Sequence, residues 1–130
     1  MTCLLGITLA APGCASRYTV PSGAPTYAAD AKISVKLTKT GNRQVTVKLV
    51  HLAPLKRIDP GLRGYVVWFS VPGQGINRAG MLSYNERRRV GKLVATTPHP
   101  KFEVFVTLER SPTVTAPTGT EIVRKLVSKI

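Results

Sequence analysis

Acidic residues are scarce in this chain: its 130 residues include six acids against 19 lysines and arginines, which gives a formal net charge of +13. The acids stand singly, at Asp30, Asp59, Glu86, Glu103, Glu109 and Glu121. This scatter excludes the closely spaced oxygen ligands of a calcium-binding loop. Folding could still bring two distant carboxylates together for glycoside hydrolysis, so a glycan-acting enzyme stays open as a minor alternative.

Cysteine and histidine are also rare. The two cysteines, Cys3 and Cys14, fall within the first 14 residues, and the histidines are His51 and His99. Zinc sites need clustered ligands, and a nucleophilic triad needs a Ser or Cys beside a His and an acid. The chain has neither a ligand cluster nor a Gly-x-Ser-x-Gly motif. We therefore expect no enzyme, no metal site and no cofactor.

The first 13 residues are apolar and carry no charged side chain. They are too few to span a bilayer, which takes about 20 residues, but they suit the hydrophobic region of a signal peptide. The small residues of the LAAPG stretch directly before Cys14 resemble a bacterial lipobox. The sequence thus predicts a signal segment over 1–13 and a lipid anchor at Cys14. The expected location is the cell envelope, on the periplasmic face of a membrane.

Two other interpretations of this segment remain open. An ordinary signal peptidase could cut after Ala15, using the small residues Gly13 and Ala15, and release a secreted protein. Alternatively, residues 1–13 could form a buried strand or helix of the fold. Pro12 stands where a lipobox usually carries Ala or Ser, and no basic residue precedes the apolar run.

Residues 14–30 are rich in proline, glycine and small residues and show no periodicity. This composition is typical of an extended linker. The sequence therefore predicts a lipidated Cys14 and a flexible tether that holds the domain away from the membrane. The alternative is an ordered arm held against the domain by Tyr18 and Tyr27.

From residue 31 to 130 the apolar residues recur mostly at every second position, as in strands with one buried face. Turn signals such as Thr40-Gly41-Asn42 and Asp59-Pro60-Gly61 separate the segments. The segment 64–71 is almost continuously apolar and predicts a central strand covered on both faces. The expected strands cover residues 32–38, 44–52, 64–71, 78–84, 90–97, 102–108 and 121–130. We expect an all-β, antiparallel, immunoglobulin-like sandwich of about seven strands.

Basic residues concentrate in two predicted loops. Arg87, Arg88 and Arg89 form a consecutive run in a turn, followed by Lys92. A second group, Lys56, Arg57 and Arg63, lies in the loop before the central strand. Guanidinium groups bind phosphates and carboxylates in a bidentate manner. These residues are therefore the anion-binding candidates, provided that the two loops meet at one end of the sandwich.

The span from Tyr65 to about Val127 resembles the periplasmic C-terminal domain of anti-sigma-K-type regulators. The matching segments are YVVW at 65–68, AGML at 79–82, FEVFVTLE at 102–109 and APTG at 116–119. The resemblance covers about half the chain and implies an extracytoplasmic β-sandwich. It carries over no binding residues and no regulatory activity. The overall layout also resembles small lipoproteins of Gram-negative bacteria.

These observations predict a non-catalytic envelope lipoprotein, a binding or interaction module with a basic sandwich. Its expected partners are the membrane, through the lipid anchor, and an anionic envelope component or a protein. Nucleic acid is not an expected partner, because the aromatic residues fall within predicted strands instead of lying between basic residues. The alternative is a structural subunit of an envelope complex.

Overall fold

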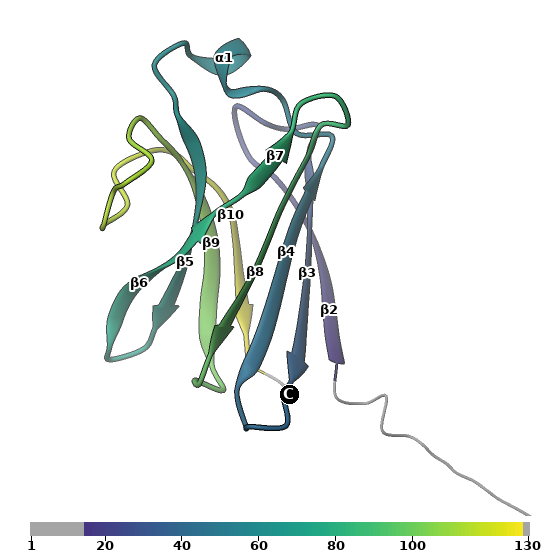
Figure 1. The fold of residues 1–130 in the computed structure, drawn as a ribbon, viewed down its shortest axis with the longest axis vertical. Helices are drawn as coiled ribbons and strands as arrows, with labels where there is room; N and C mark the ends of the chain where they lie inside the picture. The colour runs from purple at the N-terminus through teal and green to yellow at the C-terminus, as the bar shows by residue number, and fades with distance from the viewer. Residues whose placement is uncertain (1–14, 129–130) are drawn as a thin grey trace, which may run out of the picture.

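Strands with alternating buried and exposed residues form two antiparallel sheets in the computed structural model, which describes residues 15–128 (Figure 1). One sheet has five strands in the order β2-β3-β4-β8-β7, and the other has four in the order β10-β9-β5-β6. The strands are β2 (Ala15–Pro21), β3 (Asp30–Leu37), β4 (Arg43–Val50), β5 (Gly64–Val71), β6 (Gly75–Met81), β7 (Ser83–Asn85), β8 (Val90–Thr97), β9 (Phe102–Glu109) and β10 (Glu121–Val127). The predicted signal segment 1–13 and Cys14 lie outside the described residues.

The connectivity is that of an immunoglobulin-like Greek key. Without β2, the sheets read β3-β4-β8-β7 and β10-β9-β5-β6. This matches the A-B-E-D and G-F-C-C′ sheets of immunoglobulin domains, with the chain crossing between sheets after β4, β6 and β8. The predicted all-β antiparallel sandwich is confirmed.

The prediction of a flexible linker over 14–30 is wrong for Ala15–Pro21. Ala15–Pro21 forms strand β2, which pairs with β3 along its whole length. Tyr18 and Val20 pack against the core, and this short alternation is what holds the strand in place. The ordered-arm alternative is right for Tyr18, whereas Tyr27 is 76% exposed. The domain therefore includes Ala15–Pro21 instead of beginning at residue 31.

The strand predicted over 78–84 is divided between the two sheets. β6 pairs with β5 and ends at Met81, whereas β7 begins at Ser83 and pairs with β8. Between them Leu82 is buried, and its N–H donates to the carbonyl of Tyr65 (2.8 Å). The described residues therefore contain nine strands instead of seven. A four-residue helix, α1 (Leu55–Ile58), also interrupts the predicted loop between β4 and β5.

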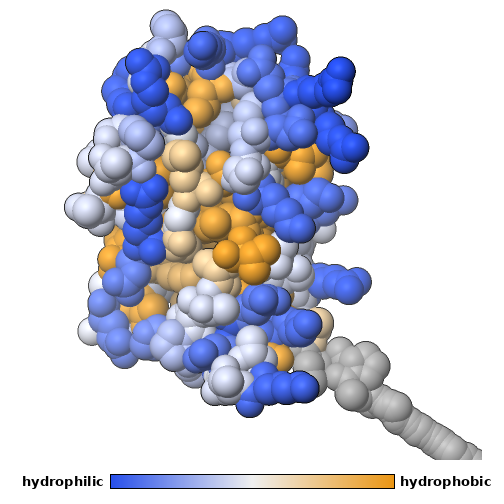
Figure 2. All heavy atoms as spheres, viewed as in Figure 1, coloured by the Kyte–Doolittle hydropathy of each residue, from blue (hydrophilic) through white to orange (hydrophobic). Residues whose placement is uncertain are grey.

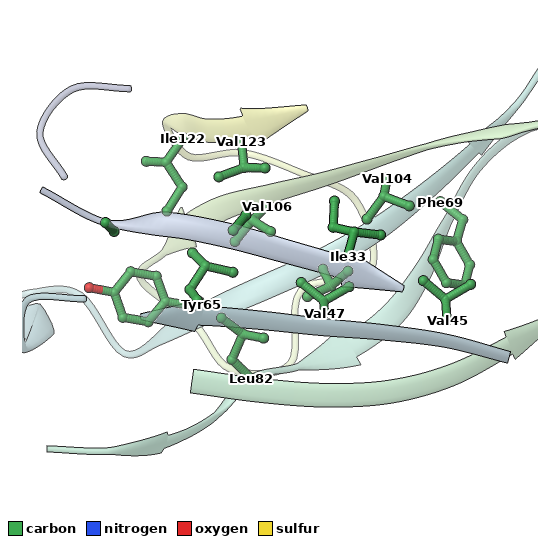
Figure 3. Packing of buried hydrophobic residues seen from close by; sticks show 14 of the residues in the cluster. Ile33, Val45, Val47, Tyr65, Phe69, Leu82, Val104, Val106, Ile122 and Val123 are labelled. Carbon is green, nitrogen blue, oxygen red and sulfur yellow. The ribbon is translucent and has the colours of Figure 1, made fainter. Parts of the chain in front are cut away.

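The core lies between the sheets (Figure 3). Val45 of the five-stranded sheet lies beside Phe69 of the other, and Ile33 and Val47 lie between Val104 and Val106. On the outer face of the four-stranded sheet, a second cluster of Val66, Trp68 and Phe105 packs against Val114 of the β9–β10 loop. Strand β5 is thus covered on both faces, as its continuous apolar sequence predicted.

Candidate functional site: a lysine face on the five-stranded sheet

Three lysines lie side by side on the outer face of the five-stranded sheet. Lys32 of β3 is the register partner of Lys48 of β4, which is the partner of Lys92 of β8. All three side chains are exposed, because the residues next to them in each strand turn inward to the core. Direct antiparallel partners stand about 5 Å apart, where like charges repel each other. The sheet therefore carries a concentrated line of positive charge.

Two more cations extend this line into a surface. Arg17 of β2 and Lys36 of β3 are exposed and share the outward parity of the lysine row. We call the set of five the lysine face: Arg17, Lys32, Lys36, Lys48 and Lys92. No ion pair within residues 15–128 involves any of them. Asp30, at the start of β3, shares the outward parity of Lys32 and is the only acidic residue in the five strands of this sheet.

The four-stranded sheet has a different charge balance. Arg124 of β10 binds Glu103 at 2.9 Å and Glu121 at 2.6 Å, and its guanidinium lies 4.2 Å from the centre of the Phe105 ring. Glu109 is fully buried and belongs to the same sheet. Most acids are therefore on or near the four-stranded sheet, and the uncompensated cations gather on the five-stranded one.

The two basic loops predicted from the sequence do meet at one end of the sandwich. α1, which carries Lys56 and Arg57, lies near the β7–β8 turn, which carries Arg87–Arg89 (Figure 1). The N–H of Leu52 donates to the carbonyl of Arg89 (2.9 Å) and thereby connects the loops.

Tyr84 strengthens this connection. Its hydroxyl donates to the carbonyl of Leu52. Burial raises the pKa of Tyr84, so the hydroxyl keeps the proton that it donates. The tyrosine also lines a shallow depression together with Lys56, Arg63 and Glu86. The turn therefore places one carboxylate, Glu86, among six cations of the predicted patch.

The remaining predicted site residues divide between these surfaces. Arg63 is exposed, and its guanidinium donates to the carbonyls of Pro60 (3.1 Å) and Leu62 (3.3 Å). Lys92 belongs to the lysine face and lies beside Lys48. The sequence interpretation missed Arg17, Lys32, Lys36 and Lys48, although the alternation in the predicted strand 32–38 already marked Lys32 and Lys36 as outward-facing.

The other reactive side chains are dispersed. His51 follows β4 and is exposed, and His99 lies in the β8–β9 turn. Within residues 15–128, no three or more His, Cys, Asp or Glu side chains gather in a way that could hold a metal ion. Asp59 binds Arg110 (2.6 Å), and this hydrogen bond lowers the pKa of the Asp59 carboxyl. The lysine face, which suits electrostatic binding of anions, is therefore the strongest candidate site.

Comparisons of this chain with protein-family models, with curated proteins and with solved structures found no match. None of the helices within residues 15–128 has the length and hydropathy needed to cross a membrane.

Proposed function

We propose that this protein is a non-catalytic binding module of the cell envelope, attached to a membrane by a lipid at Cys14, whose lysine face binds the anionic surface of that membrane. The observation that carries the proposal is the row of Lys32, Lys48 and Lys92 on three adjacent strands. Like charges in direct register destabilise a sheet. A partner that brings negative charge to the row offsets this cost.

The chemistry of the lysine face suits an array of phosphate head groups. Lysine acts as a compact point charge toward phosphate and imposes no bidentate geometry. Each lysine near an anionic bilayer contributes about 1 kcal/mol of attraction. Between the cations lie small polar residues, including Thr19, Ser34 and Thr46. The only aromatic residue in the strands that bear the five cations, Tyr18, packs against the core, so the face has no platform for stacking bases.

The position of β2 supports an orientation of the domain in which the lysine face lies toward the membrane. Ala15, the first residue of β2, is the register partner of Lys36, which belongs to the lysine face. A lipid on Cys14 would join the domain one residue before this strand. Stable membrane attachment takes two signals, such as acyl chains plus a basic surface. The anchor and the lysine face would supply both.

The lysine face is tested with two charge-matched double variants. Lys48→Glu with Lys92→Glu changes the net charge by four units, and so does Lys39→Glu with Lys101→Glu in exposed turns outside the face. On vesicles containing about one-third phosphatidylglycerol, we expect the first pair to weaken binding at least about tenfold and the second less than about threefold. The measurement is co-sedimentation across a salt series, with neutral vesicles as the blank.

Several results would contradict the proposal. Equal losses from the two pairs would mean that net charge alone governs binding. Loss only in a variant with Arg87–Arg89 changed to Glu would place binding at the β7–β8 turn. Mass spectrometry of the mature protein tests the anchor. We expect a diacylglyceryl group on Cys14, and an unmodified N-terminus would contradict the lipid attachment.

A further inference from the structure

Strand β8 is paired on one side along its length but on the other side only at its start. β4 pairs with β8 from Gly91 to Thr97. On the opposite side, β7 pairs only with Val90, Gly91 and Lys92. From Leu93 to Thr97, therefore, alternate backbone N–H and C=O groups of β8 face away from the sheet with no hydrogen-bonded strand, although β6 of the other sheet passes close to β8. Such an edge is a template for a further strand.

A groove runs beside this edge. β6 is the edge strand of the other sheet and pairs only with β5. Between β6 and β8 lies a cavity of about 440 Å³, where Phe69, Val71, Ala79 and Ala95 lie beside polar residues that include Asn77 and Thr97. Figure 2 shows apolar side chains gathered along the middle of this side of the molecule, where β6 and β8 lie toward the viewer in Figure 1.

The free part of β8 lacks the devices that usually protect edge strands. Its sequence from Leu93 to Thr97, LVATT, has no charge and no proline, and Val94 is 48% exposed. Natural proteins block such edges with lysine, proline or a bulge. The other edges are protected: β2 has Arg17 and Pro21, β10 has Arg124, β6 is paired through a bulge, and β7 is only three residues long.

We propose that the free edge of β8 binds an extended, acidic segment of a partner protein as an added strand in line with β7. The unpaired backbone groups require a strand as occupant, because only a strand satisfies a row of them. The apolar part of the lining, Phe69, Val71, Ala79 and Ala95, favours apolar side chains at every second position of that strand. The charge of the occupant follows from the surroundings of the groove. Its lining has no carboxylate and includes His99 and Arg78, whose guanidinium also donates to the carbonyls of Val114 and Pro112, and Lys92 lies just before the free edge.

The test uses a nine-residue probe peptide with valine at alternate positions and glutamate or threonine between them. Its control has the same composition in a scrambled, non-alternating order. We expect the alternating peptide to bind the full chain with a Kd in the range of about 1–100 μM, and the scrambled one at least about tenfold more weakly. Hydrogen exchange should slow at the backbone amides of residues 93–97.

Two variants separate the groove from the rest of the sheet. Ala95→Arg places a charge on the inward side, toward the groove, and is expected to weaken binding at least about tenfold. Gln44→Lys adds a charge on the neighbouring strand β4, outside the free edge, and is expected to change affinity less than about threefold. Circular dichroism confirms that each variant is folded. If Ala95→Arg unfolds the chain, the smaller Ala95→Ser change takes its place. The affinity of the peptide for that variant and the hydrogen-exchange pattern at residues 93–97 then decide whether the groove binds the peptide.

Three results would overturn the proposal. The alternating peptide could fail to bind, or it could slow exchange at β2, β6 or β10 instead of β8. The peptide could bind the Ala95→Arg variant as tightly as the original chain. A dimer that forms through β8 without peptide, seen by analytical ultracentrifugation, would show a second copy of this chain as the occupant.

Discussion

Replacement of Glu109 by glutamine is expected to lower the free energy of unfolding by about 2–3 kcal/mol at neutral pH. The carboxylate is fully buried and accepts four hydrogen bonds. The hydroxyls of Thr107 and Thr118 each donate at 2.6 Å, and the N–H groups of Thr118 and Gly119 donate at 3.1 and 3.2 Å. Glutamine has the same shape but lacks the charge, and its NH₂ group would face the hydroxyl and N–H groups that donate to the carboxylate.

The effect should depend on pH. Burial acts to raise the pKa of the Glu109 carboxyl, but the hydrogen bonds from Thr107, Thr118 and Gly119 together hold it below its ordinary value of 4.5. The stabilisation is therefore complete above that ordinary value and is lost as the pH falls through the lower folded-state pKa. Urea unfolding at pH 7 and at about pH 3 should show the gap between the original chain and the variant narrowing in acid.

The control for this prediction is Glu103→Gln. Glu103 binds Arg124 on the protein surface, and both side chains are more than one-third exposed, at 37% and 38%. An exposed ion pair contributes less than about 1 kcal/mol. If Glu109→Gln costs no more than this control, then the buried carboxylate does not hold the β9–β10 loop in place.

Replacement of Trp68 by alanine should destabilise the domain by about 3–5 kcal/mol. The indole is completely buried, lies 6.4 Å from the Phe105 ring between centroids, and packs beneath the β9–β10 loop. Its Nε1–H donates to Thr107 Oγ1 (2.8 Å), whose own hydroxyl donates to Glu109. Removing the ring therefore leaves a cavity and also breaks the hydrogen-bond chain that ends at the buried carboxylate.

The measurement is urea unfolding followed by far-UV circular dichroism, because the variant lacks the only tryptophan. Trp68→Phe keeps most of the ring volume and removes the N–H, so its smaller loss isolates the hydrogen bond. A loss below about 1 kcal/mol for Trp68→Ala would mean that the outer cluster under the loop adds nothing to the fold.

The alternation of apolar residues predicted most of the fold. Segments such as 32–38 and 102–108 have apolar side chains on one face, which packs in the core. A one-residue shift in the pairing register of such a strand would turn these side chains to water. The same logic failed for β2, because Pro21, Gly23 and Pro25 dominate a segment in which only Tyr18 and Val20 alternate. It also failed at Leu82, where the chain passes from one sheet to the other within a continuous strand pattern.

The candidate site was harder to predict than the fold. Arg87–Arg89 are predicted as a site because they are consecutive in the sequence. The structure places them in the β7–β8 turn at one end of the sandwich. Lys48 and Lys92 become neighbours only because the Greek key sets β4 beside β8, with the register that the core selects. Local sequence carries no information on that register. Charges on one sheet face are therefore found only after the strands are paired.

The central claim is that the lysine face lies against an anionic membrane surface. The most direct measurement places an environment-sensitive fluorophore on a cysteine substituted for Thr46, within the face, or for Thr113, in the loop on the opposite side of the sandwich. Cys3 and Cys14 are replaced by serine in both proteins. On anionic vesicles we expect a blue shift and protection from an aqueous quencher at position 46, with no change at position 113. Protection at position 113 with an unchanged signal at position 46 would contradict the account.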